Sequence, residues 1–254
     1  MFEDVKPHLL ELALIIGMYV LYLLMRGLAV AELESSALSH ANLIVSVEKS
    51  LWMFWESRWQ SWALENANPL VVALNWVYIA TYWPVIFIMG LVLYLRARPV
   101  YYYYRNVILV GFVAALAVFT LFPLAPPFLA SSVLGTDQVL DTIQELGPSF
   151  YGGSEMARFY NTYAAMPSLH FTWTAVLGVL VVRRFRGPWK SLGAAYPVLT
   201  FFAIIITGNH FILDAVAGGL LAGVSLGFVE LWTRLHGRRG ASRVVGLNNL
   251  VINN

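Results

Sequence analysis

The stretch "YAAMPSLHF", residues 163–171, lies where a polar segment meets an apolar stretch that continues to residue 183. Pro167 suits the first turn of a helix, because its missing N–H is not needed there and its φ angle is already helical. The N–H groups of Ser168, Leu169 and His170 then have no partner within the helix. A helix start of this kind attracts anions, and phosphate above all. We therefore expect His170 to contact whatever this helix start binds.

The composition places this stretch in a membrane protein. The chain has 254 residues, of which 59% are hydrophobic and 12% are charged, whereas a soluble domain averages about 45–50% apolar and about 25% charged residues. A bilayer is crossed by about 20 apolar residues. Stretches of that kind occupy residues 9–29, 70–95, 101–122, 167–183, 189–208 and 211–233. We therefore predict an all-α polytopic membrane protein, one domain over residues 1–254, with six transmembrane helices.

The basic residues predict how the chain is oriented in the membrane. Basic residues on the side of the termini are Lys6, Arg96, Arg98, Arg105, Arg183, Arg184, Arg186, Lys190, Arg234, Arg238, Arg239 and Arg243. Segments 30–69 and 123–166, on the opposite side, carry mostly acidic residues. Because basic loops stay cytoplasmic, we expect a plasma (inner) membrane protein with both termini and the basic, then polar tail 234–254 inside. The two long segments and the site then face outward.

Two function classes receive no support from the composition. The chain has no cysteine, so it has neither disulfides nor thiolate chemistry. Its net charge of +2 comes from basic residues at the borders of the apolar stretches, and it does not indicate a nucleic-acid partner.

A tryptophan-rich segment, "LWMFWESRWQSWALEN", follows the first apolar stretch at residues 51–66. Trp52, Trp55, Trp59 and Trp62 have the spacing i, i+3, i+7 and i+10, which places them on one face of a helix. Indole rings settle in the headgroup layer, so we predict an interfacial amphipathic helix here. The alternative is a wall beside a path by which lipids reach the site.

The second notable stretch is "GNHFILDAVAGG", residues 208–219, at the last apolar stretch. His210 and Asp214 are four residues apart, so on a helix they share a face and can form a hydrogen bond. A carboxylate inside a membrane segment costs about 2.5–3.5 kcal/mol, and such residues normally pair or serve a site. A bond to Nδ1–H of His210 would fix the tautomer and leave Nε2 as a nucleophile.

Two other interpretations of these residues remain. A histidine at a membrane border is often a polar anchor, and we expect that role for His8, His40 and His236. A zinc site needs at least three ligands, which His170, His210 and Asp214 could supply. Since the helix start already provides an anion site, we predict that neither metal nor cofactor is needed.

The motifs "MPSLH" and "GNHFILD" resemble the second and third signature motifs of the type 2 phosphatidic-acid phosphatase superfamily. They are most similar to its inositol-phosphorylceramide-synthase-like branch, in which Leu replaces the usual Gly before the histidine. "FPLAPPF" (122–128) and "VLDTIQELG" (139–147) also fit that branch. The resemblance covers residues 45–233. It implies a six-helix membrane fold, metal-independent phosphotransfer, and a phospholipid or polyprenyl phosphate substrate.

The resemblance also implies roles for individual residues. His210 resembles the nucleophile that accepts the phosphoryl group, and Asp214 resembles the residue that orients it. His170 resembles the general acid that protonates the departing oxygen and then the base that activates the acceptor. Ser168 resembles a residue that cradles phosphate oxygens.

The chain departs from the superfamily pattern where that pattern supplies basic residues. Leu91 occupies the lysine position of the first motif, Ala203-Ile204 replaces Ser-Arg before the nucleophile, and Phe128 stands where many branch members have Arg. Arginine grips phosphate oxygens in pairs, and Arg158 is our candidate for this role, with Lys49 and Arg58 as alternatives. We group Arg158, Tyr160, Asn161 and Asn209 with Ser168 as substrate-binding residues.

The function predicted from the sequence is transfer of a phosphoryl-bearing head group between a phospholipid and an alcohol acceptor, through a phosphohistidine-type intermediate. Polar residues in segment 123–166 favour a polyol acceptor such as inositol. These are Asp137, Asp141, Glu145, Glu155, Tyr160 and Asn161. One alternative is a lipid phosphate phosphatase that uses water, and another is a lipid-binding or transport protein without activity.

Overall fold

A computed structural model describes residues 2–27, 33–134, 139–148 and 162–236. Nearly all of these residues are helical, and the described part contains only one isolated bridge, between Leu124 and Ala164, in place of any strand. This agrees with the predicted all-α class. Arg158, Tyr160 and Asn161 lie outside the described residues.

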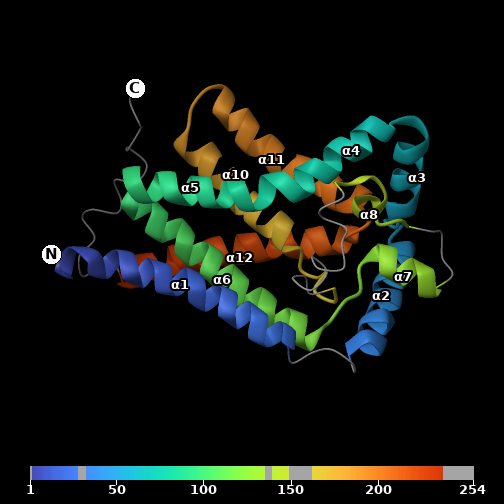
Figure 1. Ribbon diagram of the computed structural model, residues 1–254, viewed down its shortest axis with the longest axis horizontal. Coiled ribbons are helices and arrows are strands. Elements are labelled where there is room, and N and C mark those ends of the chain that lie inside the picture. The colour runs from blue at the N-terminus through green and yellow to red at the C-terminus, as the bar shows by residue number, and fades with distance from the viewer. Residues whose placement is uncertain (1, 28–32, 135–138, 149–161, 237–254) are drawn as a thin grey trace.

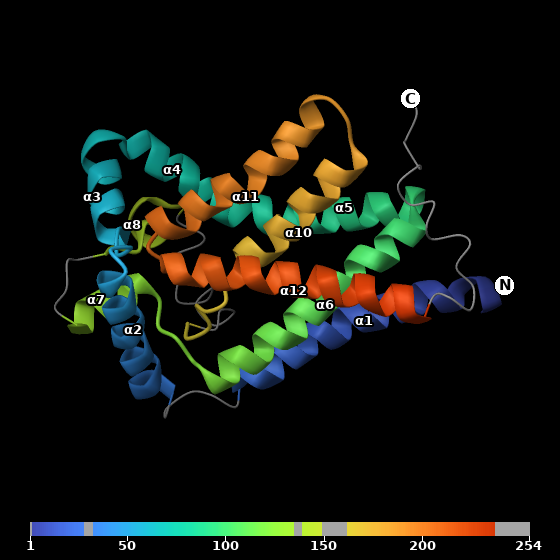
Figure 2. The ribbon, with the colours of Figure 1, turned by 180° about the vertical axis from the view of Figure 1, so that it is seen from behind.

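One group of helices runs side by side in a bundle (Figures 1 and 2). They are α1 (Phe2–Gly27), α5 (Tyr82–Arg96), α6 (Arg98–Leu121), α10 (Leu169–Arg184), α11 (Pro188–Ile206) and α12 (Ile212–His236). Helix α4 (Asn68–Trp76) joins α5 through a π-helical segment, η1 (Val77–Thr81). Helices α4, α6 and α11 each have proline in the first turn, where its missing N–H costs no hydrogen bond.

Five helical segments are long and apolar enough to cross a membrane. They are Val5–Leu24, Asn68–Arg96, Arg98–Leu121, Pro188–Ile206 and Ile212–His236, and each coincides with a predicted span. The remaining predicted span, 167–183, corresponds to α10, which has 16 residues. At about 1.5 Å per residue, α10 is shorter than the hydrocarbon core of about 30 Å. The multi-pass character is therefore confirmed, with five helices of spanning length among the described residues.

The outer surface of the bundle is apolar. Large hydrophobic side chains such as Ile15, Ile88, Leu199 and Val224 are exposed on four different helices. A soluble protein rarely exposes apolar area on that scale, whereas hydrocarbon tails cover it without cost. The short helix α10 lies inside this shell, where Val176, Leu177 and Leu180 pack against α6 and α12.

The helices α2 (Leu33–Ser50), α3 (Glu56–Asn66), α7 (Pro127–Leu134) and α8 (Thr142–Leu146) gather at one end of the bundle, opposite the start of α1 and the end of α12 (Figures 1 and 2). Of these, only α3 lies in a segment for which a helix was predicted. Ala37, Ala41 and Val45 of α2 pack with Leu124, Ala130 and Phe211, so α2 is part of the core at this end.

The predicted tryptophan face is wrong in its extent. Helix α3 begins only at Glu56, with Trp55 as its N-cap, so Trp52 and Trp55 precede the helix. Trp62 is 58% exposed, whereas Glu56 and Gln60, on the polar face, are buried. The polar face of α3 therefore faces the protein, where backbone groups need partners. Trp62 faces outward, whereas Trp59 is half-buried and packs against Phe201 and Phe202 of α11.

Candidate active site

The starts of α10 and α12 lie against each other through their backbones. The N–H of Ser168 donates to the carbonyl of Asp214 at 3.1 Å, and the hydroxyl of Thr172 donates to the carbonyl of Gly218 at 3.1 Å. A Cβ at Gly218 would lie 2.7 Å from the carbonyl oxygen of Ser168, so only glycine permits this approach. Two segments that are distant in sequence are thus fixed together at one end of the bundle.

The start of α10 differs from the prediction by two residues. Ser168 is the N-cap and accepts from the N–H of Phe171 at 3.4 Å, so Pro167 precedes the helix. Ser168 is fully buried, and its N–H is bound to Asp214 and not free for an anion. Among the described residues, no hydrogen bond reaches the N–H groups of Leu169 and His170. These two first-turn donors are the ones that α10 offers to an anion.

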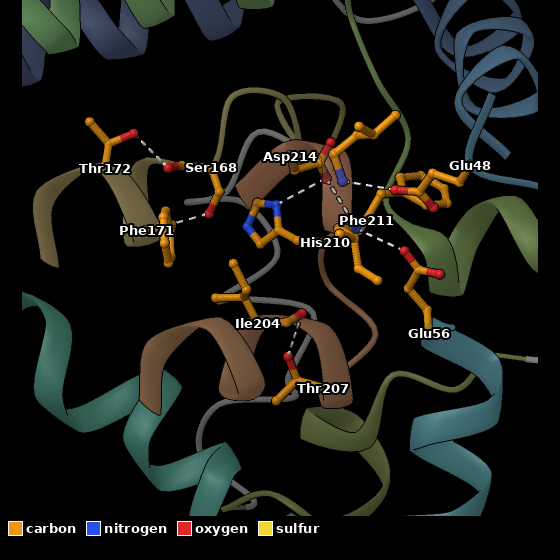
Figure 3. A network of polar contacts seen from close by, with 12 residues as sticks. Glu48, Glu56, Ser168, Phe171, Thr172, Ile204, Thr207, His210, Phe211 and Asp214 are labelled. Carbon is orange, nitrogen blue, oxygen red and sulfur yellow. Dashed lines mark hydrogen bonds and ion pairs between the residues drawn. The ribbon is translucent and has the colours of Figure 1, made fainter. Parts of the chain in front are cut away.

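His210 and Asp214 form the predicted pair (Figure 3). Nδ1 of His210 lies 3.3 Å from Oδ2 of Asp214. The predicted shared helix face is wrong, because α12 begins at Ile212 and His210 precedes it. The contact forms because the Asp214 carboxylate points back over the helix start, where it also accepts from the N–H of Phe211 at 2.9 Å. This bond engages Nδ1 of His210, so Nε2 is the nitrogen available for chemistry.

His170 and His210 are neighbours, with ring centroids 6.1 Å apart. The ring of His170 is held by two tyrosines, Tyr78 at 4.3 Å and Tyr82 at 4.0 Å between centroids. Tyr78 lies in the π-helical segment η1 and Tyr82 directly follows it. Such insertions are frequent at functional sites. The sequence analysis did not assign these tyrosines, because the extra residue of a π turn leaves no periodicity signal.

The loop that carries His210 is held by the polar face of α3. The Gln60 amide donates to the carbonyls of Ile206 at 2.9 Å and Leu140 at 2.8 Å, and its oxygen accepts from the N–H of Leu140 at 2.7 Å. Gly208 has a φ of 78°, and a Cβ there would lie 2.4 Å from the carbonyl oxygen of Leu140. The turn before His210 therefore requires glycine, and Gln60 connects this turn to the chain at Leu140.

Two glutamates that the sequence analysis did not assign bind the start of α12 (Figure 3). The N–H of Ile212 donates to Oε1 of Glu56 at 2.8 Å, and the N–H of Leu213 donates to Oε1 of Glu48 at 2.8 Å. Both glutamates are fully buried. The only sequence signal was that Glu56 and Gln60 lie off the face that carries the tryptophans. The first-turn donors of α12 are thus occupied by the protein itself.

The described contacts of the other candidate substrate-binding residues are with other parts of the protein. The Asn209 amide donates to the carbonyl of Thr207 at 3.2 Å and is half-buried beside His210. Lys49 lies over the ring of Phe54. Arg58 is exposed and lines a pocket of about 640 Å³ between α3 and Leu140, to which neither His170 nor His210 contributes. Their contacts with substrate remain predictions.

A zinc site requires at least three ligands close together. Among the described residues, no three His, Cys, Asp or Glu side chains lie together as ligands of one ion. His210 pairs with Asp214, and His170 lies beside His210. That the reaction needs no metal ion stays a prediction.

Fold and site together define a multi-pass membrane protein with two histidines and an aspartate at one end of its helix bundle. A family model described as the PAP2 superfamily matches residues 42–228, which include this entire centre and both glutamates. The chain belongs to the PAP2 superfamily. This membership supports a function of the lipid phosphatase or phosphotransferase type, acting on a lipid phosphate. Comparisons with curated proteins and with solved structures found no match.

The role of Gln60 leads to a stability prediction. Gln60→Glu replaces the amide donor by a carboxylate that faces the carbonyls of Ile206 and Leu140. Leaving buried groups unsatisfied costs about 1–3 kcal/mol each, so we expect a clear fall in the thermal unfolding temperature of the protein in detergent. Asn66→Asp is the matched control, because Asn66 makes the same kind of bond, to the carbonyl of Trp62, at an exposed position of α3. Equal unfolding temperatures for the two variants would contradict the role of Gln60.

Proposed function

We propose that this protein transfers the phosphoryl group of a lipid phosphate to water through a covalent intermediate on His210. The observation that supports the proposal is the meeting of the His210–Asp214 pair with His170 at the start of α10. The free N–H groups of Leu169 and His170 would bind phosphate oxygens there. The proposal needs no metal ion.

In the first step, the lone pair of Nε2 of His210 attacks phosphorus, and the bond between phosphorus and the lipid oxygen breaks. His170, protonated, donates its proton to the departing oxygen, so that the lipid leaves as a neutral alcohol. Asp214 accepts from Nδ1–H and stabilises the positive charge that develops on the ring. Tyr78 and Tyr82 hold the ring of His170 in place throughout.

In the second step, His170 acts as a base and removes a proton from water. The water oxygen attacks phosphorus, the bond between Nε2 and phosphorus breaks, and inorganic phosphate leaves. His170 has then regained the proton that it donated in the first step, and His210 is free again.

The acceptor proposed here is water, whereas the function predicted from the sequence used an alcohol. That preference rested on polar residues of segment 123–166, but Asp141 accepts from the N–H groups of Ile143 at 3.0 Å and Gln144 at 3.3 Å and caps α8. Glu145 is exposed on α8, and the others lie outside the described residues. Among the described residues we therefore see no polyol site, and transfer to an alcohol becomes an outcome of the test below.

We also propose that α10 crosses the membrane as the sixth span and that the site faces the outer side. The start of α1 and the end of α12 lie together at the end of the bundle away from the site (Figure 1). Helices α5, α10 and α12 carry basic residues in their last turns, namely Arg96, Arg183, Arg184 and Arg234, and basic loops stay cytoplasmic. A lipid in the outer leaflet would then present its phosphate at the level of His170 and His210.

The first test of this proposal uses purified protein with labelled phosphatidic acid. His210→Ala and His170→Ala should each lower phosphate release by several orders of magnitude, because the two residues act as one unit. Asp214→Asn should also be severe, since it disturbs the tautomer of His210, but it should leave measurable turnover. Unchanged thermal unfolding temperatures would show that the variants fold. Full turnover by His210→Ala would exclude the mechanism.

The same assay identifies the acceptor and the need for metal. Turnover should persist in EDTA. Rising concentrations of inositol or glycerol should leave the rate of phosphate release unchanged. Formation of a new phosphodiester at the expense of phosphate would instead identify a transferase. A protein that binds the lipid but gives neither product would have to be a binding or transport protein.

Topology can be tested with single cysteines, because the chain has none of its own. Glu145→Cys, on the exposed side of α8, should react with a membrane-impermeant maleimide in intact cells. Arg234→Cys, near the end of α12, should react only after the cells are permeabilised. The opposite labelling pattern would overturn the outward orientation of the site.

A further inference from the structure

Three carboxyl groups from three helices meet at the start of α12. Glu48 belongs to α2, Glu56 to α3 and Asp214 to α12 itself, and all three are fully buried. They accept, in order, from the N–H groups of Leu213, Ile212 and Phe211. Three consecutive backbone donors are thus bound by three different side chains, and Glu48 and Glu56 have no part in the proposed reaction.

The second oxygens of Glu48 and Glu56 show what else these residues do. Oε2 of each is buried, and among the described residues no N–H or O–H group donates to either. If both side chains were ionised, two buried charges at neighbouring backbone donors would each keep an oxygen without a donor, which is costly. Because an ionised carboxylate can only accept, a bond between these two oxygens requires a proton on one of the two side chains.

We infer that Glu48 and Glu56 share one proton as a carboxylic acid–carboxylate pair, and that this pair is a positioning device for the His210–Asp214 dyad. Their bonds to Ile212 and Leu213 fix the first turn of α12, from which Asp214 reaches back to His210. The consequence for turnover rests on the proposed function, whereas the shared proton does not.

In the proposed pair we place the proton on Glu48. Burial, together with the neighbouring carboxyl group of Glu56, raises the pKa of Glu48 from 4.5 to about 10. The charge of Asp214 acts in the same direction, and only the bond from the N–H of Leu213 opposes it. The titratable groups that face Glu48 are therefore Glu56 from α3 and Asp214 from α12, with His210 bound to Asp214. In the proposed pair, Oε2–H of Glu48 donates to Oε2 of Glu56.

A single shared proton suits the charge at this position. A helix start carries roughly half a positive charge, so a carboxylate is favourable beside its donors. An ionised Glu48 would be a third buried carboxylate there and would repel both Glu56 and Asp214, and burying an unpaired charge is costly. The protonated acid still accepts from Leu213 through Oε1, so all three backbone donors stay satisfied.

A proton on Glu48 makes the stability of the folded protein depend on pH. The unfolded chain releases the Glu48 proton near its ordinary pKa of 4.5, whereas the folded protein holds it to about pH 10. The folded state therefore binds the extra proton between these values, and stability should fall as pH rises through this window. Glu48→Gln, which needs no proton, should lose this part of the pH dependence.

The test is infrared difference spectroscopy on the purified protein at neutral pH, without substrate. A protonated carboxyl group has a carbonyl band separate from that of carboxylates, and Glu48→Gln should abolish one such band. The amide can accept from Leu213 and donate to Glu56, so this variant should keep the unfolding temperature and turnover of the parent protein. Glu65→Gln, at an exposed position of α3, is the matched control and should leave the band intact.

Glu48→Ala supplies the contrast. It leaves Leu213 without its acceptor and should lower both the unfolding temperature and the turnover, and Glu48→Gln should restore both. A carbonyl band that is unchanged in Glu48→Gln would overturn the shared proton. Unfolding of Glu48→Gln at the same temperature as Glu48→Ala would overturn the assignment of the proton to Glu48. The infrared band and the unfolding temperature are both measured without substrate, so these two tests do not depend on the proposed reaction.

Discussion

The backbone N–H groups at the buried start of α12 must find acceptors inside the protein, and the arrangement of the site depends on this requirement. Phe211, Ile212 and Leu213 are supplied by Asp214, Glu56 and Glu48, respectively. Unpaired buried donors would cost about 1–3 kcal/mol each, so the three carboxyl groups are constrained to one place. Because two of them come from α2 and α3, the helices at the end of the bundle are connected to the residue that orients His210.

The starts of α10 and α12 differ in which backbone N–H groups lack a partner, and this difference indicates where a phosphate would bind. Protein carboxyl groups occupy α12, so an incoming phosphate would be repelled there. At α10 the N–H groups of Leu169 and His170 have no partner among the described residues. Since His210 Nε2 is the free ring nitrogen, a phosphate bound at α10 would meet the proposed nucleophile on one side and His170 on the other. An anion site made of backbone donors also suits a chain that lacks the basic residues common in related motifs.

The sequence was informative where the physical signal is local. Runs of about 20 apolar residues predict spans directly, and five of the six coincide with helices of spanning length. The pairing of His210 with Asp214 was predicted from spacing, although the contact arises from a carboxylate folded back over the helix start and not from a shared helix face. Glu48, Glu56 and Gln60 could not be assigned, because periodicity defines the face of a helix but not what that face contacts. Tyr78 and Tyr82 were missed for a related reason, since a π turn shifts the register by one residue.

The central claim is that His210 becomes covalently phosphorylated, and chemical trapping of that species tests it most directly. Purified protein would be mixed with a lipid phosphate labelled with radioactive phosphorus, quenched within milliseconds under alkaline denaturing conditions, and digested for mass spectrometry. The account predicts label on the peptide that contains His210, stable in base and lost in acid, as expected for phosphorus bound to nitrogen. The label should accumulate in His170→Ala if the loss of His170 slows the attack by water more than it slows the departure of the lipid. Turnover without label on His210 in either protein, or label on another residue, would contradict the account.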